Sequence, residues 1–422
     1  MSALNANLTS PAVLLAVGAS RLSGLGTILA VHELHAHTTA FQCNQLMNER
    51  SIDEASAYEI AFSIASLVIN NTSWLAVGAP GAPTTVPRAA DGGNAGAVFL
   101  LYPGTDTART HIGYGTIELA PAAIMPFNLA PNDRFGSSIA VLGADVLPRL
   151  LVGATGRGTR GEGEIIALQL STVDTVDNVT HFNASDPLLS PFLPSGAQLG
   201  ASVASVGSIG VTSAPDSLSV AACGVPRGGR GVQSGNAMGI VLLLQLRRST
   251  VSLAGVLAIG DGMGGFPSGL LLPGDRFGAA VATVGDVDGD GTVDLAIGSP
   301  GGSRGGMDGS GAVFIAFLAV DPSSLPGVSG SSMGIGIEID IVKGVMELSA
   351  SGDSLSSHLM LRPGDAFGSA LAGGGDWSGD GVPDIAVGAP GRRTASGVGS
   401  GAVFVLILAS PYKTPQHNGV AG

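Results

Sequence analysis

Two short acidic segments hold the residues of this chain that are best suited to chemistry. The first acidic loop, residues 286–294, reads DVDGDGTVD and has carboxylates at its positions 1, 3, 5 and 9, from Asp286, Asp288, Asp290 and Asp294. This alternation turns successive carboxylates toward one centre, while Gly291 permits the sharp turn and the Thr292 carbonyl supplies a further oxygen. Calcium prefers several hard oxygen ligands of this kind. We expect the first acidic loop to bind Ca²⁺.

The second acidic loop, residues 376–384, repeats the pattern as DWSGDGVPD. Its expected ligands are the side chains of Asp376, Ser378, Asp380 and Asp384 and the carbonyl of Val382. Because Ser378 stands where the first loop has a carboxylate, the second loop has one negative charge fewer. We expect it to bind Ca²⁺ more weakly.

The alternative to a metal site is an ordinary turn, because Asp and Gly dominate turns for local reasons. Carboxylates that cluster without a cation, however, repel by about 4 kcal/mol per close pair at an effective dielectric constant near 20. The first loop is not an EF-hand, since its position 12 is Ile297 in place of a bidentate Glu and strands are expected on both sides. Mg²⁺ suits an all-protein oxygen cage of this size less well than Ca²⁺ does.

A sequence repeat positions both loops. Residues 274–300 align without a gap with 364–390, and 311–318 align with 401–408, both at an offset of 90 residues. Weaker copies begin near residues 59, 133 and 197, and a half copy begins near residue 13. The expected units are about 12–57, 58–130, 131–195, 196–272, 273–362 and 363–409, followed by a C-terminal tail at 410–422.

Each unit predicts successive antiparallel strands, because short runs of Ala, Val, Ile and Leu alternate with turns that contain Gly and Pro. Repeats of this length with four strands are typical of a β-propeller. We therefore expect an all-β fold, a propeller with six recognisable blades. The earlier units have lost the acidic loop, at 68–76, 142–151 and 208–219, and we expect these segments to turn without metal.

Composition narrows the function classes. The chain has 422 residues with 66 Gly and 24 Pro, 12% charged residues and a formal net charge of −13. The low share of charged residues disfavours a disordered chain, and the negative net charge disfavours nucleic acid and anionic lipid as partners. No apolar run is long enough to span a membrane as a helix. Whether Cys43 and Cys223 pair stays open. Five N-glycosylation sequons are compatible with secretion, although the first twenty residues contain no visible signal peptide: Asn7, Asn70, Asn71, Asn178 and Asn183.

These motifs together resemble the FG-GAP repeat family, whose best-known members are the N-terminal propellers of integrin α subunits. The resemblance rests on the acidic loops, on Gly-Ala-Pro or Gly-Ser-Pro turns at 78–80, 298–300 and 388–390, and on three Phe-Gly steps: Phe135-Gly136, Phe277-Gly278 and Phe367-Gly368. It implies a propeller of usually seven blades, Ca²⁺ in loops on one face, an extracellular location and a ligand-binding role. The first unit lacks a Phe-Gly strand and the last lacks an outer strand, so we expect that Met1 is not the natural start and that upstream residues complete both blades. Seven blades are possible if the chain is incomplete at its N-terminus.

We expect this chain to act without catalysis, as an extracellular adhesion module that recognises a protein or glycan ligand. One alternative is the accessory propeller of a larger secreted hydrolase, such as a phospholipase. A lectin is another, although repeated aromatic pockets are not expected from only two tryptophans, Trp74 and Trp377. Neither a Gly-x-Ser-x-Gly elbow at a strand-helix turn nor a His-Glu-x-x-His motif is present.

Two further groups of residues have both a functional and an ordinary interpretation. His35 and His37 have a spacing that suits zinc on one strand face, or they lie in a solvated loop. Arginines that follow the turns of several units either gather into a surface for an acidic ligand or remain solvated loop charges: Arg157, Arg160, Arg227, Arg230, Arg392 and Arg393.

Overall fold

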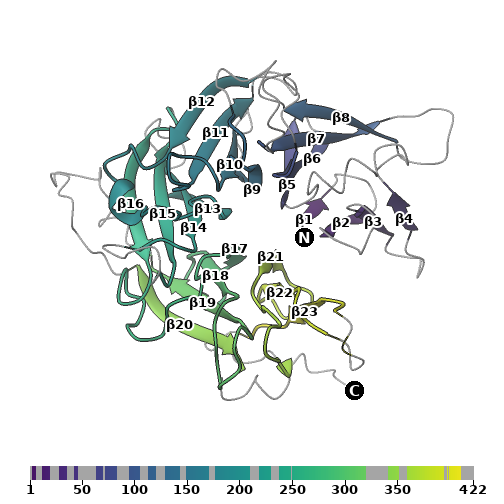
Figure 1. Cartoon of the computed structure of the whole chain (residues 1–422). Helices are drawn as coiled ribbons and strands as arrows, with labels where there is room; N and C mark the ends of the chain where they lie inside the picture. Colours follow the sequence, from purple (N-terminus) through teal and green to yellow (C-terminus); the bar gives the residue numbers. More distant parts are fainter. Residues whose placement is uncertain are drawn as a thin grey trace, which may run out of the picture. The chain divides into compact units, whose positions relative to one another are not determined.

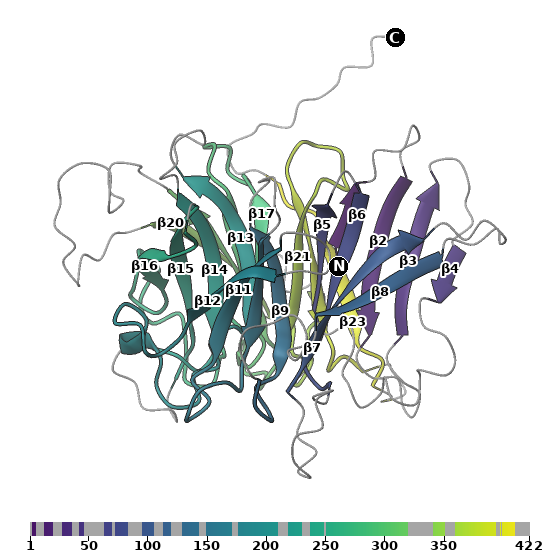
Figure 2. The ribbon, with the colours of Figure 1, turned by 90° about the horizontal axis from the view of Figure 1, so that it is seen from above.

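The computed structural model is all-β, and its strands form six antiparallel sheets (Figures 1 and 2). The structure describes residues 2–5, 12–19, 28–35, 42–45, 63–69, 72–82, 95–104, 113–119, 129–142, 149–170, 176–209, 218–229, 237–248, 250–319, 341–350, 359–393, 397 and 399–409. Two compact units are distinguished. One comprises Met1–Ser205 with Arg247–Leu253, and the other comprises Val206–Leu246 with Ala254–Gly422.

The first unit contains three four-stranded sheets, each with its strands in chain order. The first sheet consists of β1 (Ser2–Asn5), β2 (Ala12–Ala19), β3 (Ile28–His35) and β4 (Gln42–Gln45). The second consists of β5 (Ser63–Ile69), β6 (Thr72–Ala79), β7 (Ala97–Gly104) and β8 (Gly113–Leu119). The third consists of β9 (Phe135–Leu142), β10 (Arg149–Ala154), β11 (Glu164–Leu170) and β12 (Val176–Phe182), followed by the short 3₁₀ helix η2 (Ser190–Phe192).

The second unit contains two complete sheets of its own. One consists of β17 (Ala280–Gly285), β18 (Asp294–Ser299), β19 (Ala312–Leu318) and β20 (Val342–Ser349). The other has three strands within the described residues, β21 (Ala370–Gly375), β22 (Asp384–Ala389) and β23 (Ala402–Leu406). The remaining sheet, β13 (Ser202–Ile209), β14 (Leu218–Val225), β15 (Ile240–Arg247) and β16 (Leu253–Ile259), has residues in both units.

The second strand of a sheet is buried along most of its length, as its apolar sequence predicts. Every residue of β14 and of β18 is buried, and in β22 only one residue is partly exposed. In the second unit, Val313 and Ile315 of β19 share a buried cluster with Ile385 and Val387 of the following sheet. The core therefore lies between the faces of successive sheets, which is how propeller blades bury their apolar surface.

The Phe-Gly steps join neighbouring sheets. Phe277 is fully buried, its N–H donates to the Met238 carbonyl at 2.9 Å, and it forms a parallel bridge with Gly239 of the preceding sheet. A Cβ on Gly278 would meet the Ile240 carbonyl oxygen at 2.6 Å, so only glycine allows this close approach. Phe135 and Phe367 make the equivalent bridges to Gly96 and Gly311.

The fold class is therefore an all-β propeller, as expected, with five complete four-stranded blades and one three-stranded sheet in the described residues. One detail differs from expectation. The first sheet has a fourth strand although its sequence contains no Phe-Gly step, since β1 pairs with β2 in antiparallel register from Ser2↔Ala16 to Asn5↔Val13. Among the described residues, no helix is long and apolar enough to cross a bilayer.

Candidate metal site

A β-bulge shapes the entrance to each acidic loop. The first acidic loop connects β17 to β18, and the register of this pair shifts between Thr283 and Gly285, so that Gly285 lies opposite Asp294. Gly285 has a φ of +80°, a conformation that favours glycine. The pair β21–β22 has the same shift before the second acidic loop, where Gly375 lies opposite Asp384. The bulge places the last carboxylate of each loop at the first position of a buried strand.

Asp294 is the anchor of the first acidic loop. Its side chain is fully buried and accepts the N–H of Val287 and the N–H of Leu318, both at 2.9 Å. The first bond closes the loop on itself, and the second ties the loop to the end of β19. Burial raises the pKa of Asp294 to about 6, and the carboxylates of Asp288 and Asp290 act in the same direction.

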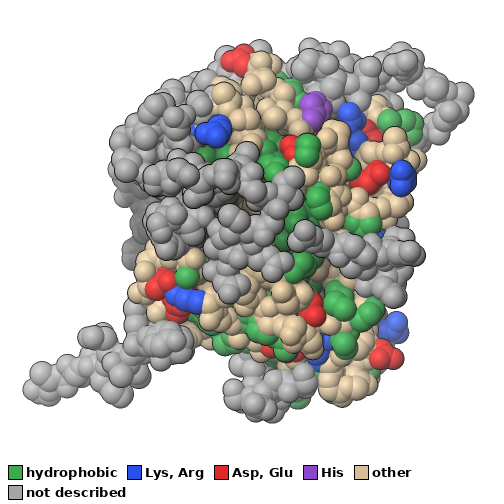
Figure 3. Space-filling view, turned by 90° about the vertical axis from the view of Figure 1, so that its left-hand side faces the viewer, with side chains coloured by type: hydrophobic (Ala, Val, Ile, Leu, Met, Phe, Trp, Pro, Cys, Tyr) green, Lys and Arg blue, Asp and Glu red, His purple; other side chains and the backbone are tan. Residues whose placement is uncertain are grey.

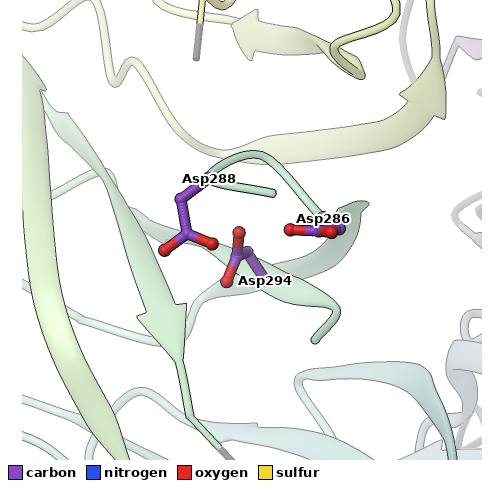
Figure 4. Close-up of side chains that lie close together, drawn as sticks. All are labelled: Asp286, Asp288 and Asp294. Carbon is purple, nitrogen blue, oxygen red and sulfur yellow. The ribbon is translucent and has the colours of Figure 1, made fainter. Parts of the chain in front are cut away.

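Three carboxylates of the first loop converge. Ligand oxygens of Asp286, Asp288 and Asp294 lie within 4.8 Å of one another, and Figure 4 shows the three side chains directed toward a common region. Asp286 also accepts the N–H groups of Gly289, at 2.6 Å, and of Gly291, at 2.8 Å, which hold its carboxylate in place. The alternating pattern of the sequence therefore brings these carboxylates together as expected.

The fourth carboxylate of the loop has a partner that the sequence did not indicate. Lys343 of β20 forms ion pairs with Asp288, at 2.8 Å, and with Asp290. Asp290 also accepts the N–H of Thr292 at 2.7 Å. Although partial burial acts in the opposite direction, the Lys343 ammonium and the Thr292 donor lower the pKa of Asp290. The same ion pairs raise the pKa of Lys343 to about 12, against the effect of burial.

This donor set fits a hard divalent cation. Three carboxylates within a few ångströms of one another provide charged oxygens, which are the ligands that Ca²⁺ and Mg²⁺ take in proteins. Asp286, Asp288 and Asp294 would bind the ion directly, whereas Asp290, the fourth carboxylate of the loop, is paired with Lys343. The Thr292 carbonyl remains a predicted ligand.

The second acidic loop has the same backbone arrangement with fewer charges. Asp384 is fully buried and accepts the N–H groups of Trp377, at 2.7 Å, and Leu408, at 3.0 Å. Asp376 is exposed, and its pKa is lowered mainly by the N–H of Gly381, which donates at 2.9 Å. Ser378 donates its hydroxyl to Asp376 at 3.3 Å.

The remaining predicted ligands of the second loop are Asp380 and the Val382 carbonyl. Asp380 is exposed and accepts the N–H of Val382 at 2.8 Å, while the Val382 side chain is buried. The role of the Val382 carbonyl stays a prediction. Among the described residues, the cluster of three acids that could hold a metal lies in the first loop, because Ser378 replaces one acid of the second.

Two of the arginines that follow the turns, Arg157 and Arg392, form ion pairs, which differs from both interpretations of the sequence: a surface for an acidic ligand and solvated loop charges. Arg157 pairs with Asp133 at 2.5 Å, and Arg392 pairs with Asp365 at 2.5 Å, so neither is free for an acidic ligand. Arg304 makes the equivalent pair with Asp275, at 2.8 Å. On the face in Figure 3, the basic side chains of the described residues are scattered and do not form one patch.

A sequence signal for these pairs exists, since each aspartate stands two residues before a Phe-Gly step. The unit that begins near residue 197 has Ala197 at this position and lacks the pair. Arg160, Arg227 and Arg393 are exposed, and Arg230 lies outside the described residues.

Replacing Arg392 with Met should destabilise the protein by about 1.5–3 kcal/mol, because the buried Asp365 would lose a charge-assisted hydrogen bond. Chemical denaturation measures this difference. Arg160→Met is the matched control, since Arg160 is exposed, and its effect should be about 0.5 kcal/mol or less. Equal stability of both variants would contradict the role assigned to the pair.

The other residues singled out from the sequence can be placed in part. Cys223 is a free, fully buried thiol, and burial raises its pKa. Asn178 is exposed on β12, whereas Asn183 donates its amide to Glu164 at 2.9 Å. The side chains of His35 and Cys43 and the residues Asn7, Asn70, Asn71 and His37 lie outside the part of the structure that is described.

Comparison with known proteins identifies the repeats. The model of the FG-GAP repeat matches residues 277–315 and 367–406, which contain both acidic loops. Human integrin alpha-X is 36% identical over 120 residues, and mouse integrin alpha-M is 36% identical over 121 residues. Each match covers 28% of this chain and 8% of the integrin, so the chain spans a small part of these relatives.

The solved structures that align with this chain have little sequence in common with it. Penicillium chrysogenum α-L-arabinanase in complex with arabinobiose is 11% identical with a TM-score of 0.48, over 96% of this chain and 92% of that one. The NanB sialidase of Streptococcus pneumoniae, as a K499G mutant, is 12% identical with a TM-score of 0.36, over 65% and 32%. The sequence matches are the informative ones, and they show that the chain contains FG-GAP repeats at residues 277–315 and 367–406, which carry the two acidic loops.

Proposed function

We propose that this chain is a calcium-stabilised extracellular binding module without catalytic activity. The observation that carries the proposal is the convergence of Asp286, Asp288 and Asp294 within an FG-GAP repeat. A cation bound by these carboxylates relieves their mutual repulsion and holds the loop to Asp294, which begins β18 and accepts the N–H of Leu318 at the end of β19. Calcium therefore acts on the stability of the fold and leaves the other loops available for a ligand.

The ligand class that we propose is a protein. The similarity to integrin α chains favours recognition of a protein ligand outside the cell. A lectin is not favoured, because repeated aromatic pockets would require several equivalent exposed aromatic side chains. The two tryptophans are not equivalent, since Trp74 is 8% exposed and Trp377 is 49% exposed.

Calcium should raise the melting temperature of the protein, because a ligand that binds only the folded state stabilises it by about 2.7 kcal/mol at a hundredfold excess over Kd. The measurement is thermal unfolding in EDTA and in millimolar Ca²⁺, with Mg²⁺ at the same ionic strength as the control. We expect the largest rise with Ca²⁺, a smaller one with Mg²⁺ and none with EDTA. Identical melting curves in EDTA and Ca²⁺ would contradict the proposal.

A further inference from the structure

Lys343 occupies a special position on the strand that flanks the first acidic loop. The register of β19 and β20 shifts between Phe317, which lies opposite Gly344, and Leu318, which lies opposite Val342. Lys343 is therefore the extra residue of a β-bulge, a feature that redirects a side chain away from the regular ladder. Leu318 is also the residue whose N–H holds Asp294. The bulge thus brings the lysine to the acidic loop.

The corresponding β-bulge in another blade has an extra residue of the opposite charge. In the sheet β9–β12, Gln169 lies opposite Asn178 and Leu170 lies opposite Val176, so that Asp177 is the extra residue. Asp177 is exposed, and the corresponding loop of that unit, at 142–151, has lost its acidic pattern. The bulge residue is the cationic Lys343 in the unit whose acidic loop is complete, and it is the anionic Asp177 in the unit that has lost the acidic loop. This difference indicates that Lys343 serves the acidic loop.

The ammonium group occupies oxygens that a metal ion would need. Lys343 pairs with Asp288, whose carboxylate belongs to the converging cluster, and with Asp290. Its side chain is 34% exposed, so the ammonium can turn into solvent on its flexible stem when an ion arrives. Four carboxylates less one ammonium leave a formal charge of −3, the same as that of the three carboxylates in the second acidic loop. Lys343 therefore offsets the additional negative charge from which the first loop was expected to bind Ca²⁺ more tightly than the second.

We propose that Lys343 is an internal counter-ion that competes with Ca²⁺ for Asp288 and Asp290, holds the loop together without metal and lowers the affinity of the first acidic loop for Ca²⁺. This inference rests on the proposed function. Lys343 lies outside the acidic loop and sets the affinity of that loop for Ca²⁺. With Lys343 present, the stability of the loop depends less on calcium than it would with four unpaired carboxylates.

The test uses Lys343→Met, which keeps the stem and removes the charge, and Lys343→Arg, which keeps the charge. Both are made in an Asp376→Asn background, so that the first loop is observed alone. In calorimetric Ca²⁺ titrations, Lys343→Met should bind about tenfold more tightly than the parent, because a cation next to the site has been removed. Lys343→Arg should bind as the parent does.

Thermal unfolding is a second measurement. A lysine with only a structural role would change the melting temperature equally with and without Ca²⁺. In EDTA, Lys343→Met should melt below the parent because the carboxylates lose their counter-ion, and in saturating Ca²⁺ the difference should vanish or reverse. Equal affinities, or an equal loss of melting temperature with and without Ca²⁺, would overturn the inference and leave the calcium site standing. If neither protein binds Ca²⁺, the proposed function fails together with the inference.

Discussion

Phe277→Ala should destabilise the protein by about 3–5 kcal/mol, the usual cost of removing a fully buried aromatic ring. The Phe277 ring is packed edge-to-face against Phe266, with centroids 5.1 Å apart, and against Phe314, with centroids 5.7 Å apart. Because the backbone of Phe277 also bridges to the preceding sheet, the cavity would open at the junction of two blades. Equilibrium denaturation by urea measures the effect.

Phe277→Leu is the matched control, because the equivalent position of another unit is naturally Leu199, which is fully buried and forms the same bridge to Gly163. We expect this variant to lose clearly less stability than Phe277→Ala. If alanine and leucine had the same effect, the ring packing would not be what holds this junction together.

Asp294→Ala should have a comparably large effect, in two separable parts. Without any metal it leaves the buried N–H groups of Val287 and Leu318 without their acceptor, at a cost of about 1–3 kcal/mol each. With Ca²⁺ present it also abolishes the response of the first acidic loop, because the central ligand is missing. Unfolding in EDTA and in Ca²⁺ separates the two parts.

Asp286→Ala is the control for this prediction. Asp286 belongs to the same cluster but is only half-buried, so its loss should remove the calcium response at a smaller cost in EDTA. An Asp294→Ala protein as stable as the parent in EDTA would show that Asp294 has no structural role of its own.

The sequence alone was sufficient for the fold class, the repeat and the convergence of three of the four predicted carboxylates. An offset of 90 residues between two blocks predicts equivalent blades, and the strands β17 to β19 and β21 to β23 start at positions with this offset. Alternating aspartates around glycines predict that carboxylates converge, because the pattern is local and needs no knowledge of distant segments.

Long-range partners were not predictable in the same way. Lys343 is 53 residues from Asp290, and it reaches the loop because of a β-bulge that has no sequence signature of its own. The pairing of Arg392 with Asp365 also depends on the way the turn folds back on the start of its own blade. For this pair the sequence did contain a signal, because an aspartate two residues before the Phe-Gly step recurs at Asp133 and Asp275.

Calcium stoichiometry tests the central claim most directly. Equilibrium dialysis of the purified chain against radioactive Ca²⁺ should give two bound ions per chain, one for each acidic loop. Asp286→Asn and Asp376→Asn should each remove one of them, and the double variant should remove both. Absence of bound ions at millimolar Ca²⁺, or retention of both ions by the double variant, would contradict the assignment of these loops as calcium sites.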